Sequence, residues 1–338
     1  MKVILNVFDP LEDDLSNGFL NSGVQRCQVL AIAEEVPESN YNLRLILEKL
    51  KLENVSYYLA FDLKCANAVF GLSSHSGKHS CLWCEGLSSL EKGTIRTLGS
   101  LDYWYSHYAE NGSIKKDMKN YMNVINPRIL YYEENPDTVL EQLIPPPELH
   151  ILIGFVKSLG ILLLDAWPGF DQWLVSNNIF QRGYQGRGWD GNNSNRILKN
   201  LDSLEVDVSK SMPMLLPVVQ CLKDFRSVKE ACFGKALQPD YKRTFTVLRN
   251  SFLSAQEIAD ILGLKLNCTW KVHILFCHVE PFIEFHNCGL SKFAEQCGEA
   301  IHAKFKPTWN RFKRNSEHPE HAKRLTSSAI DFNTRRIS

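Results

Sequence analysis

Two short metal-ligand motifs, placed nearly two hundred residues apart, constrain this chain more than any other feature of its sequence. Cys81-Leu-Trp-Cys84 has the CxxC spacing of half a tetrahedral zinc site, and His273-Ile-Leu-Phe-Cys-His278 offers two histidines as the other half. A structural zinc ion needs four such soft or borderline ligands. One ion bound by both halves would close a very long loop.

Other interpretations of these residues stay open at this point. His75 and His79 flank the CxxC motif and would complete a local site without the distant pair. A lone CxxC can also be two buried thiols, because free cysteine behaves as a small hydrophobe. No secretory signal pattern opens the sequence, so we expect the ten cysteines to be reduced thiols with one metal-binding pair rather than a disulfide framework.

Length and composition allow a large buried core. The chain has 338 residues, 44% of them hydrophobic, which is enough for one elaborated domain or two. The longest apolar stretch, residues 151–164, contains Lys157 and is shorter than a bilayer-spanning helix needs to be. We therefore expect a soluble protein with no membrane partner.

Charge is distributed unevenly along the chain. The formal net charge is zero, which argues mildly against DNA binding. From residue 304 to the end, however, nine basic residues face three acidic ones, and Trp309 and Phe312 lie among them. A basic segment with aromatic residues suits contact with a phosphate backbone. The alternative is a solvated C-terminal helix.

The early part of the chain has strand patterns and the later part has helical ones. Residues 3–8 and 28–33 are short β-type runs that we expect to pair as neighbouring antiparallel strands. Residues 42–52 have helical spacing, and residues 55–61 resemble a buried strand that ends at Asp62. From about residue 90 to 266 the pattern is mainly helical.

The ordered set of motifs resembles the catalytic core of the V(D)J recombinase large subunit, the recombination-activating protein, and of the related Transib-type DDE transposases. The shared features are Asp62 after a buried strand, the CxxC pair, the two histidines and a final acid at Glu299, with weaker echoes in Pro145-Pro-Pro-Glu-Leu-His150 and Gly191-Asn192. The resemblance runs from near Met1 to about Phe312. It selects Cys81, Cys84, His273 and His278 as the zinc ligands.

This resemblance implies an α/β fold with an RNase H-like sheet core, incomplete at its first strand, and a large, mainly helical insertion that contains the zinc. Residues 1–89 would be the first part of the core and residues 90–268 the helical insertion. Residues 269–315 would bring the zinc-ligand histidines and the last catalytic Glu back to the core, and residues 316–338 would form a basic tail.

The resemblance also implies catalytic carboxylates. Asp62 and Glu299, with Glu295 as the alternate to Glu299, would hold Mg²⁺ or Mn²⁺, because phosphodiester chemistry of this kind uses two divalent ions about 4 Å apart. The strand expected to carry the first Asp of the triad is absent from the sequence, so we expect a degenerate site. Without the resemblance, both glutamates would be an exposed acidic helix face capped by Ser291.

The predicted function is therefore a transposon-derived, nuclear DDE recombinase core that lacks one catalytic acid. DNA would be its partner, with a second copy or an accessory protein subunit as further options. The predicted DNA contacts are Lys304, Lys306, Arg311, Lys313 and Arg314. The alternative is a non-catalytic, zinc-stabilised module that binds DNA or a protein.

Overall fold

The fold is taken from a computed structural model of the whole chain. It describes residues 2–6, 27–32, 36–51, 60, 62–73, 77–129, 135–181, 187–293, 296–314 and 317–337. The strands are β1 (Lys2–Asn6) and β2 (Cys27–Ile32). The helices before the long central one are α1 (Asn40–Leu50), α2 (Leu63–Val69), α3 (Leu98–Glu110), the 3₁₀ helix η4 (Lys115–Tyr121) and α4 (Leu140–Leu143).

The rest of the described chain is helical. Its first elements are α5 (Glu148–Ala166), α6 (Gly169–Ser176), α7 (Gly191–Lys199), α8 (Leu201–Ser211), η6 (Pro213–Leu215), α9 (Leu216–Cys232) and α10 (Tyr241–Ile261). They are followed by α11 (Trp270–Ile274), the π-helix η7 (Leu275–Val279), α12 (Glu280–His286), η8 (Leu290–Phe293), α13 (Gln296–Phe312) and α14 (His321–Ile337).

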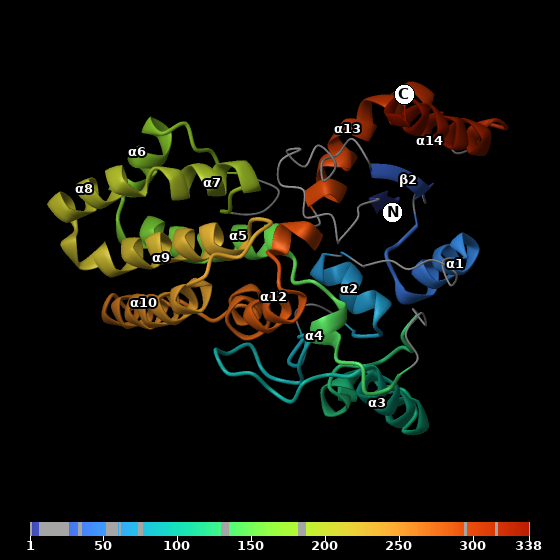
Figure 1. Cartoon of the computed structure of the whole chain (residues 1–338), viewed down its shortest axis with the longest axis horizontal. Helices are drawn as coiled ribbons and strands as arrows, with labels where there is room; N and C mark the ends of the chain where they lie inside the picture. The colour runs from blue at the N-terminus through green and yellow to red at the C-terminus, as the bar shows by residue number, and fades with distance from the viewer. Residues whose placement is uncertain are drawn as a thin grey trace.

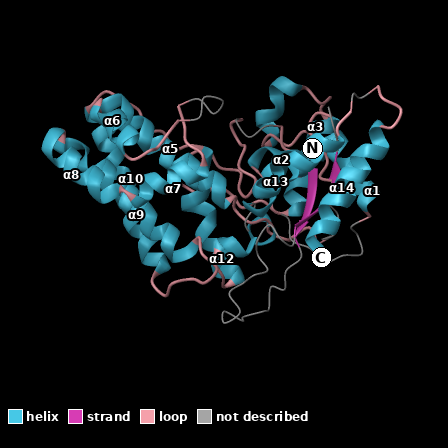
Figure 2. Ribbon diagram, turned by 90° about the horizontal axis from the view of Figure 1, so that it is seen from above, coloured by secondary structure: helices cyan, strands magenta, loops and turns pink. Residues whose placement is uncertain are grey.

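These elements form two lobes (Figures 1 and 2). Helices α6 to α10 lie at one end of the molecule, and the two strands, α1, α3 and the α13–α14 hairpin lie at the other. Between them, α12 lies close to α4, as their contacts confirm. The chain therefore passes through the middle of the molecule both before and after the helical lobe.

The expected RNase H-like α/β fold is wrong for the described part of the chain, which is mainly helical. The strands described there form only a two-stranded antiparallel sheet, in which Lys2 pairs with Ile32 and Asn6 with Cys27. This pairing confirms the two expected neighbouring strands. The strand expected at residues 55–61 lies, apart from Ala60, outside the described residues.

The main hydrophobic core is built from helices packed on helices, which is why a sheet-centred fold does not describe it. Helix α5 lies at its centre and packs on α7, α9 and α11. Ile151, Phe155 and Leu159 of α5 are completely buried. Although α5 is long and apolar enough to cross a membrane, this burial is that of a core helix.

Two glycines allow neighbours to approach α5 closely. A Cβ atom on Gly154 would lie 2.2 Å from the side chain of Lys271, which precedes the histidine pair, and one on Gly160 would lie 2.5 Å from the Trp189 ring. Any larger residue would force these neighbours apart, because interiors are closely packed. Gly154 thus brings α11 against the core helix.

The C-terminal helices form a smaller, separate core with the sheet. Ile301 and Phe305 of α13 and Phe332 of α14 bury their side chains around Val29 of β2. The side-chain amide of Asn333 accepts a hydrogen bond from the Val29 N–H and donates one to the Val29 carbonyl, both at 3.0 Å. These are the two bonds that a neighbouring strand would make, so α14 covers the outer edge of β2.

Candidate metal centre

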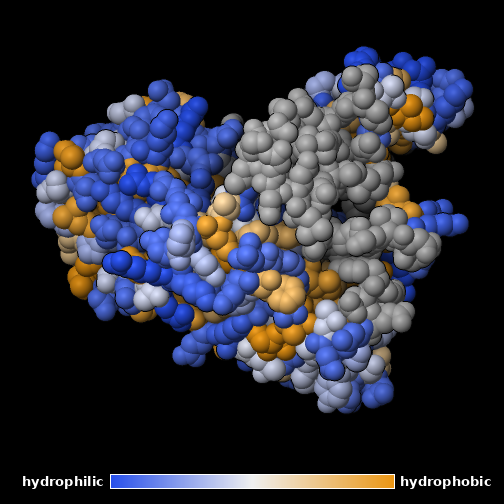
Figure 3. Space-filling view, viewed as in Figure 1, coloured by the Kyte–Doolittle hydropathy of each residue, from blue (hydrophilic) through white to orange (hydrophobic). Residues whose placement is uncertain are grey.

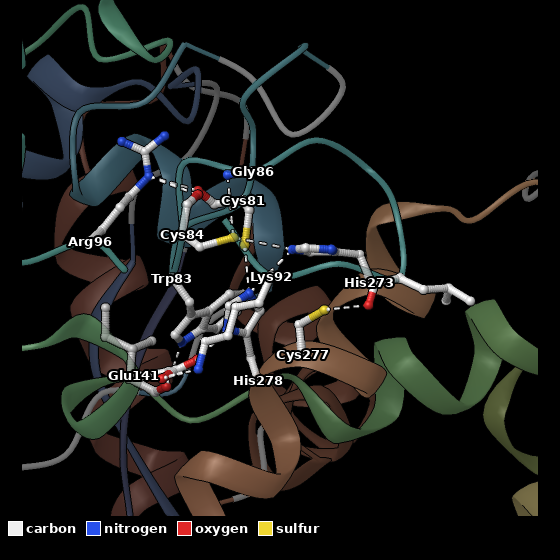
Figure 4. A network of polar contacts seen from close by, with 12 residues as sticks. Cys81, Trp83, Cys84, Gly86, Lys92, Arg96, Glu141, His273, Cys277 and His278 are labelled. Atoms are coloured by element: carbon white, nitrogen blue, oxygen red, sulfur yellow. Dashed lines mark hydrogen bonds and ion pairs between the residues drawn. The ribbon is translucent and has the colours of Figure 1, made fainter. Parts of the chain in front are cut away.

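The four predicted zinc ligands meet at one buried point. The ligand atoms of Cys81, Cys84, His273 and His278 all lie within 4.8 Å of one another, and all four residues are buried. The Cys81 Sγ lies 3.3 Å from His278 Nε2, and the Cys84 Sγ lies 3.3 Å from His273 Nε2. The structure thus confirms that the CxxC pair and the two distant histidines form one group that could hold a metal ion such as zinc (Figure 4).

The spacing of these atoms fits a tetrahedral ion. With the usual zinc–nitrogen and zinc–sulfur bond lengths, two nitrogens should be about 3.3 Å apart and a nitrogen and a sulfur about 3.5 Å apart. The two histidine Nε2 atoms are 3.2 Å apart, and both nitrogen–sulfur distances are 3.3 Å. An ion at the centre would replace these mutual polar contacts with four coordinate bonds.

The cysteine half of the site is a compact turn between α2 and α3. Trp83, between the two cysteines, is fully buried and donates from its indole nitrogen to the Ile144 carbonyl at 2.9 Å. Its ring stacks on that of His278 with centroids 5.8 Å apart. The turn is closed by Gly86 and Gly93, whose backbones approach so closely that a Cβ atom on Gly93 would lie 2.3 Å from the Gly86 nitrogen.

The histidine half lies on one continuous helical segment. Thr269 caps α11 by accepting a hydrogen bond from the Val272 N–H. His273 lies in α11, and His278 lies in the π-helix η7 that follows it. π-Helical turns are rare and occur often at functional sites, because they change which side chains share a face.

The remaining nitrogen of each imidazole has its own partner. The Nδ1 atom of His273 lies 2.7 Å from the Ser89 carbonyl, and the Nδ1 atom of His278 bonds to the Glu141 carboxylate. Lys92 in turn lies 2.7 Å from the Glu141 Oε1 atom. Such partners fix the tautomer that presents Nε2 to the metal, and they are typical of metal-binding histidines (Figure 4).

The groups around the two thiols shift the pKa values of Cys81 and Cys84 in opposite directions. The hydrogen bond from the Cys81 thiol, followed by those from the two histidines, holds the pKa of Cys84 well below its usual range. Burial, followed by that shared hydrogen bond, raises the pKa of Cys81. These directions favour the thiolate form at Cys84, and a bound cation would stabilise both thiolates, since metals bind the thiolate form.

The competing ligands are excluded or not tested. The Nδ1 atom of His79 lies 2.8 Å from the Glu85 carbonyl, and His79 is not part of the cluster. His75 lies outside the described residues. Burial raises the pKa of the neighbouring Cys268 and Cys277 to about 12, and neither thiol belongs to the four-residue cluster.

The predicted catalytic acids are not brought together by anything the structure describes. Asp62 caps α2, and its Oδ1 atom accepts a hydrogen bond from the Cys65 N–H at 2.7 Å. Glu299 lies in α13, but its side chain and the whole of Glu295 fall outside the described residues. The alternative in which Ser291 caps the helix with these acids is wrong, because Ser291 lies in η8 and α13 begins later.

The predicted DNA-contacting residues lie on α13 and just after it. Lys304 and Lys306 are exposed on α13, followed by the exposed Lys313 and Arg314. Arg311 is different, because it forms an ion pair with Asp331 of α14. Figure 3 shows hydrophilic residues over much of this hairpin.

No protein-family model matches the chain, and no curated protein gives a significant match. The sequence motifs indicate the four ligands but not Glu141, Ser89 or the buried Arg96 around them. Glu141 belongs to no motif with a recognisable spacing, so the sequence does not mark it as a partner of a metal ligand. A backbone acceptor such as the Ser89 carbonyl carries no side-chain signal at all.

Proposed function

We propose that this chain is a non-catalytic DNA-binding module in which one structural zinc ion joins the cysteine turn between α2 and α3 to the histidine-bearing segment of α11 and η7. The single observation that carries the zinc is the buried cluster of two cysteines and two histidines from segments 189 positions apart. Two thiolates, two imidazoles and no free coordination position are typical of structural rather than catalytic zinc. Binding free energy at such a site becomes folding free energy.

Metal analysis of the purified protein tests the zinc. One zinc ion per chain is expected, with loss of the ion after Cys84→Ser or His273→Ala. Cys232→Ser is the matched control, because Cys232 is equally buried but donates its thiol proton to the Val228 carbonyl within α9. Retention of zinc in both ligand variants would contradict the proposal, as would its absence from the unmodified chain.

The α13–α14 hairpin supports DNA as the partner. Nine basic and three acidic residues lie from residue 304 onward. Two of these three acids are engaged within the hairpin: Asp331 pairs with Arg311 and Arg335, and Glu320 pairs with Arg324. The exposed Lys304 and Lys306 are left to attract phosphates. Such contacts release condensed counterions, so binding should weaken steeply with salt.

A salt titration of duplex DNA binding tests this partner. We expect affinity to fall by orders of magnitude between about 50 and 200 mM salt, equally for unrelated sequences. The double variant Lys304→Ala/Lys306→Ala should lower the slope of log K against log salt by about 2. Lys115→Ala/Lys116→Ala, on the exposed 3₁₀ helix η4, is the control. Binding that does not depend on salt would sink the proposal.

DNA cleavage is the second candidate function, and only the resemblance to recombinases supports it. Asp62 already acts as a helix cap, which accounts for its position without a catalytic metal. Nicking of supercoiled DNA in Mn²⁺ decides between the two functions. Cleavage abolished by both Asp62→Ala and Glu299→Ala would establish the enzyme, whereas we expect none.

A further inference from the structure

A completely buried arginine lies behind the cysteine half of the metal centre. The side chain of Arg96 has 0% exposure. Its Nε donates to the carbonyl oxygens of Cys81 and Cys84 at 3.0 and 3.1 Å, and its Nη2 donates to those of His79 and Met122 at 3.1 and 2.8 Å. One guanidinium therefore holds the main chain of both cysteines from the side opposite their sulfurs (Figure 4).

The backbone of Arg96 extends this connection to the histidine half. Its N–H donates to the Trp83 carbonyl at 2.9 Å, and its carbonyl accepts from the Leu140 N–H at 3.0 Å. Leu140 is the first residue of α4 and precedes Glu141, the partner of His278. Arg96 is thus bonded to the cysteine turn and to the short helix that orients one histidine.

Fold stability alone does not explain why the charged Arg96 side chain is buried. A buried cation loses its hydration, and the nearest carboxylate oxygen, of Glu85, lies 4.0 Å from Nη1. That same oxygen accepts from the Trp104 indole at 2.5 Å. An apolar residue of similar volume often stabilises a core as well or better. What it could not do is bond to four carbonyl oxygens at once, which requires the planar fork of a guanidinium.

We propose that Arg96 is a positioning residue of the metal centre, which holds the CxxC turn in its ligand-ready conformation before the metal binds. The inference rests on the proposed zinc site and adds that half of this site is built by the protein alone. With the turn already ordered, the metal has only to join it to the histidine helix. Less conformational entropy is then lost on binding, which raises affinity.

Zinc affinity, measured by competition with a chromophoric chelator, tests the role. Arg96→Met should weaken affinity by between about ten-fold and a hundred-fold, and Arg96→Lys should recover part of the loss. The control is Arg128→Met. Arg128 is also nearly buried and pairs with Asp102 of α3, so its loss should lower the melting temperature without changing zinc affinity. Wild-type affinity in Arg96→Met would overturn the inference.

Hydrogen exchange of the chelated wild-type chain provides a test that needs no variant to fold. Amides of the turn, such as those of Glu85 and Arg96, should remain protected without metal, because their partners lie within the turn itself. Rapid exchange there would show that the metal, not Arg96, orders the turn. If the wild-type chain binds no zinc, the proposed function fails. If it binds zinc and the Arg96 variants bind equally well, only this inference fails.

Discussion

His273 and His278 are five positions apart in one helical segment, yet their Nε2 atoms are only 3.2 Å apart. In a regular α-helix, residues five apart differ by about 140° around the axis and point to different sides. The π-helix Leu275–Val279 widens the turn so that residues five apart come close to alignment. Pro281 follows it in the first turn of α12, where it has no N–H to donate to the Cys277 carbonyl four residues earlier.

The first prediction follows from this proline. Pro281→Ala should restore an α-helical hydrogen bond and favour a regular helix, which would move the two histidines apart. We expect zinc affinity to fall on the order of ten-fold, as for other residues that orient ligands. Pro217→Ala, in the first turn of α9, is the matched change without a metal ligand nearby. Equal loss of affinity in both variants would disprove the link.

The second prediction concerns Glu141, which bonds to the Nδ1 atom of His278 and pairs with Lys92. Glu141→Gln keeps a polar group but removes the charge, so zinc affinity should fall about ten-fold, and Glu141→Leu should lower it further. Glu205→Gln, which removes another lysine-paired carboxylate, is the control. Chelator competition measures all three. An unchanged affinity in Glu141→Leu would mean that His278 needs no orienting partner.

The third prediction compares two glycines in contact. A Cβ atom on Gly289 would lie 1.9 Å from the Gly234 carbonyl oxygen, whereas one on Gly234 would meet nothing within 4 Å. Gly289→Ala should therefore cost about 1–3 kcal/mol of unfolding free energy, since rigid backbone must move. Gly234→Ala should change stability by less than about 0.5 kcal/mol. Urea unfolding of metal-loaded protein measures both, and the reverse order would be incompatible with this packing.

The fourth prediction concerns Asn333, whose amide bonds to both outward-facing backbone groups of the buried Val29. Asn333→Leu leaves these groups without partners, at a cost of about 1–3 kcal/mol. Hydrogen exchange at the Val29 amide should speed up. Self-association should also increase, because the open edge of β2 carries neither charge nor proline. In Thr334→Val, which removes a hydroxyl bonded within α14, neither effect is expected.

The fifth prediction is a pH dependence. Burial, and to a smaller extent Glu284, raise the pKa of the half-buried Glu280 carboxyl. The folded state then holds the proton more tightly than the unfolded state, so this group's contribution to stability falls as pH rises through its folded pKa. Glu280→Gln should therefore melt higher than wild type near pH 7. The difference should shrink in acid, below about pH 4. A difference in melting temperature that does not change with pH would contradict this prediction.

How much of this could be predicted from the sequence differs between the site and the fold. The four ligands were predictable with the resemblance, which selected His273 and His278 over the two histidines beside the CxxC pair. The role of Arg96 was not predictable, because the sequence around a single arginine in a loop does not show whether its side chain is solvated or buried. The π-helix was not predicted either. Pro281 nevertheless indicates an interruption of the α-helical hydrogen-bond pattern before it, because proline has no N–H to donate.

The fold class was predicted wrongly because the resemblance placed a sheet where the described chain packs helices. The two early strands, in contrast, pair as expected. Helix α5 begins at Glu148 directly after three prolines, a residue type that is accepted at a helix start. Ser254 and Glu257 have the spacing of a helix start but lie within α10, where burial of Phe252 and Ala255 outweighs the capping signal. Tertiary packing therefore decided where α10 begins.

The long sequence separation of the metal ligands also has a consequence for synthesis. Cys81 precedes its neighbour His278 by 197 positions, so it leaves the ribosome well before that partner exists. At the usual rates of translation, roughly 10 to 40 s pass between them. During that interval the nascent cysteine pair has no histidines to complete the site. Both thiols therefore remain without these partners until the segment that carries the two histidines has been made.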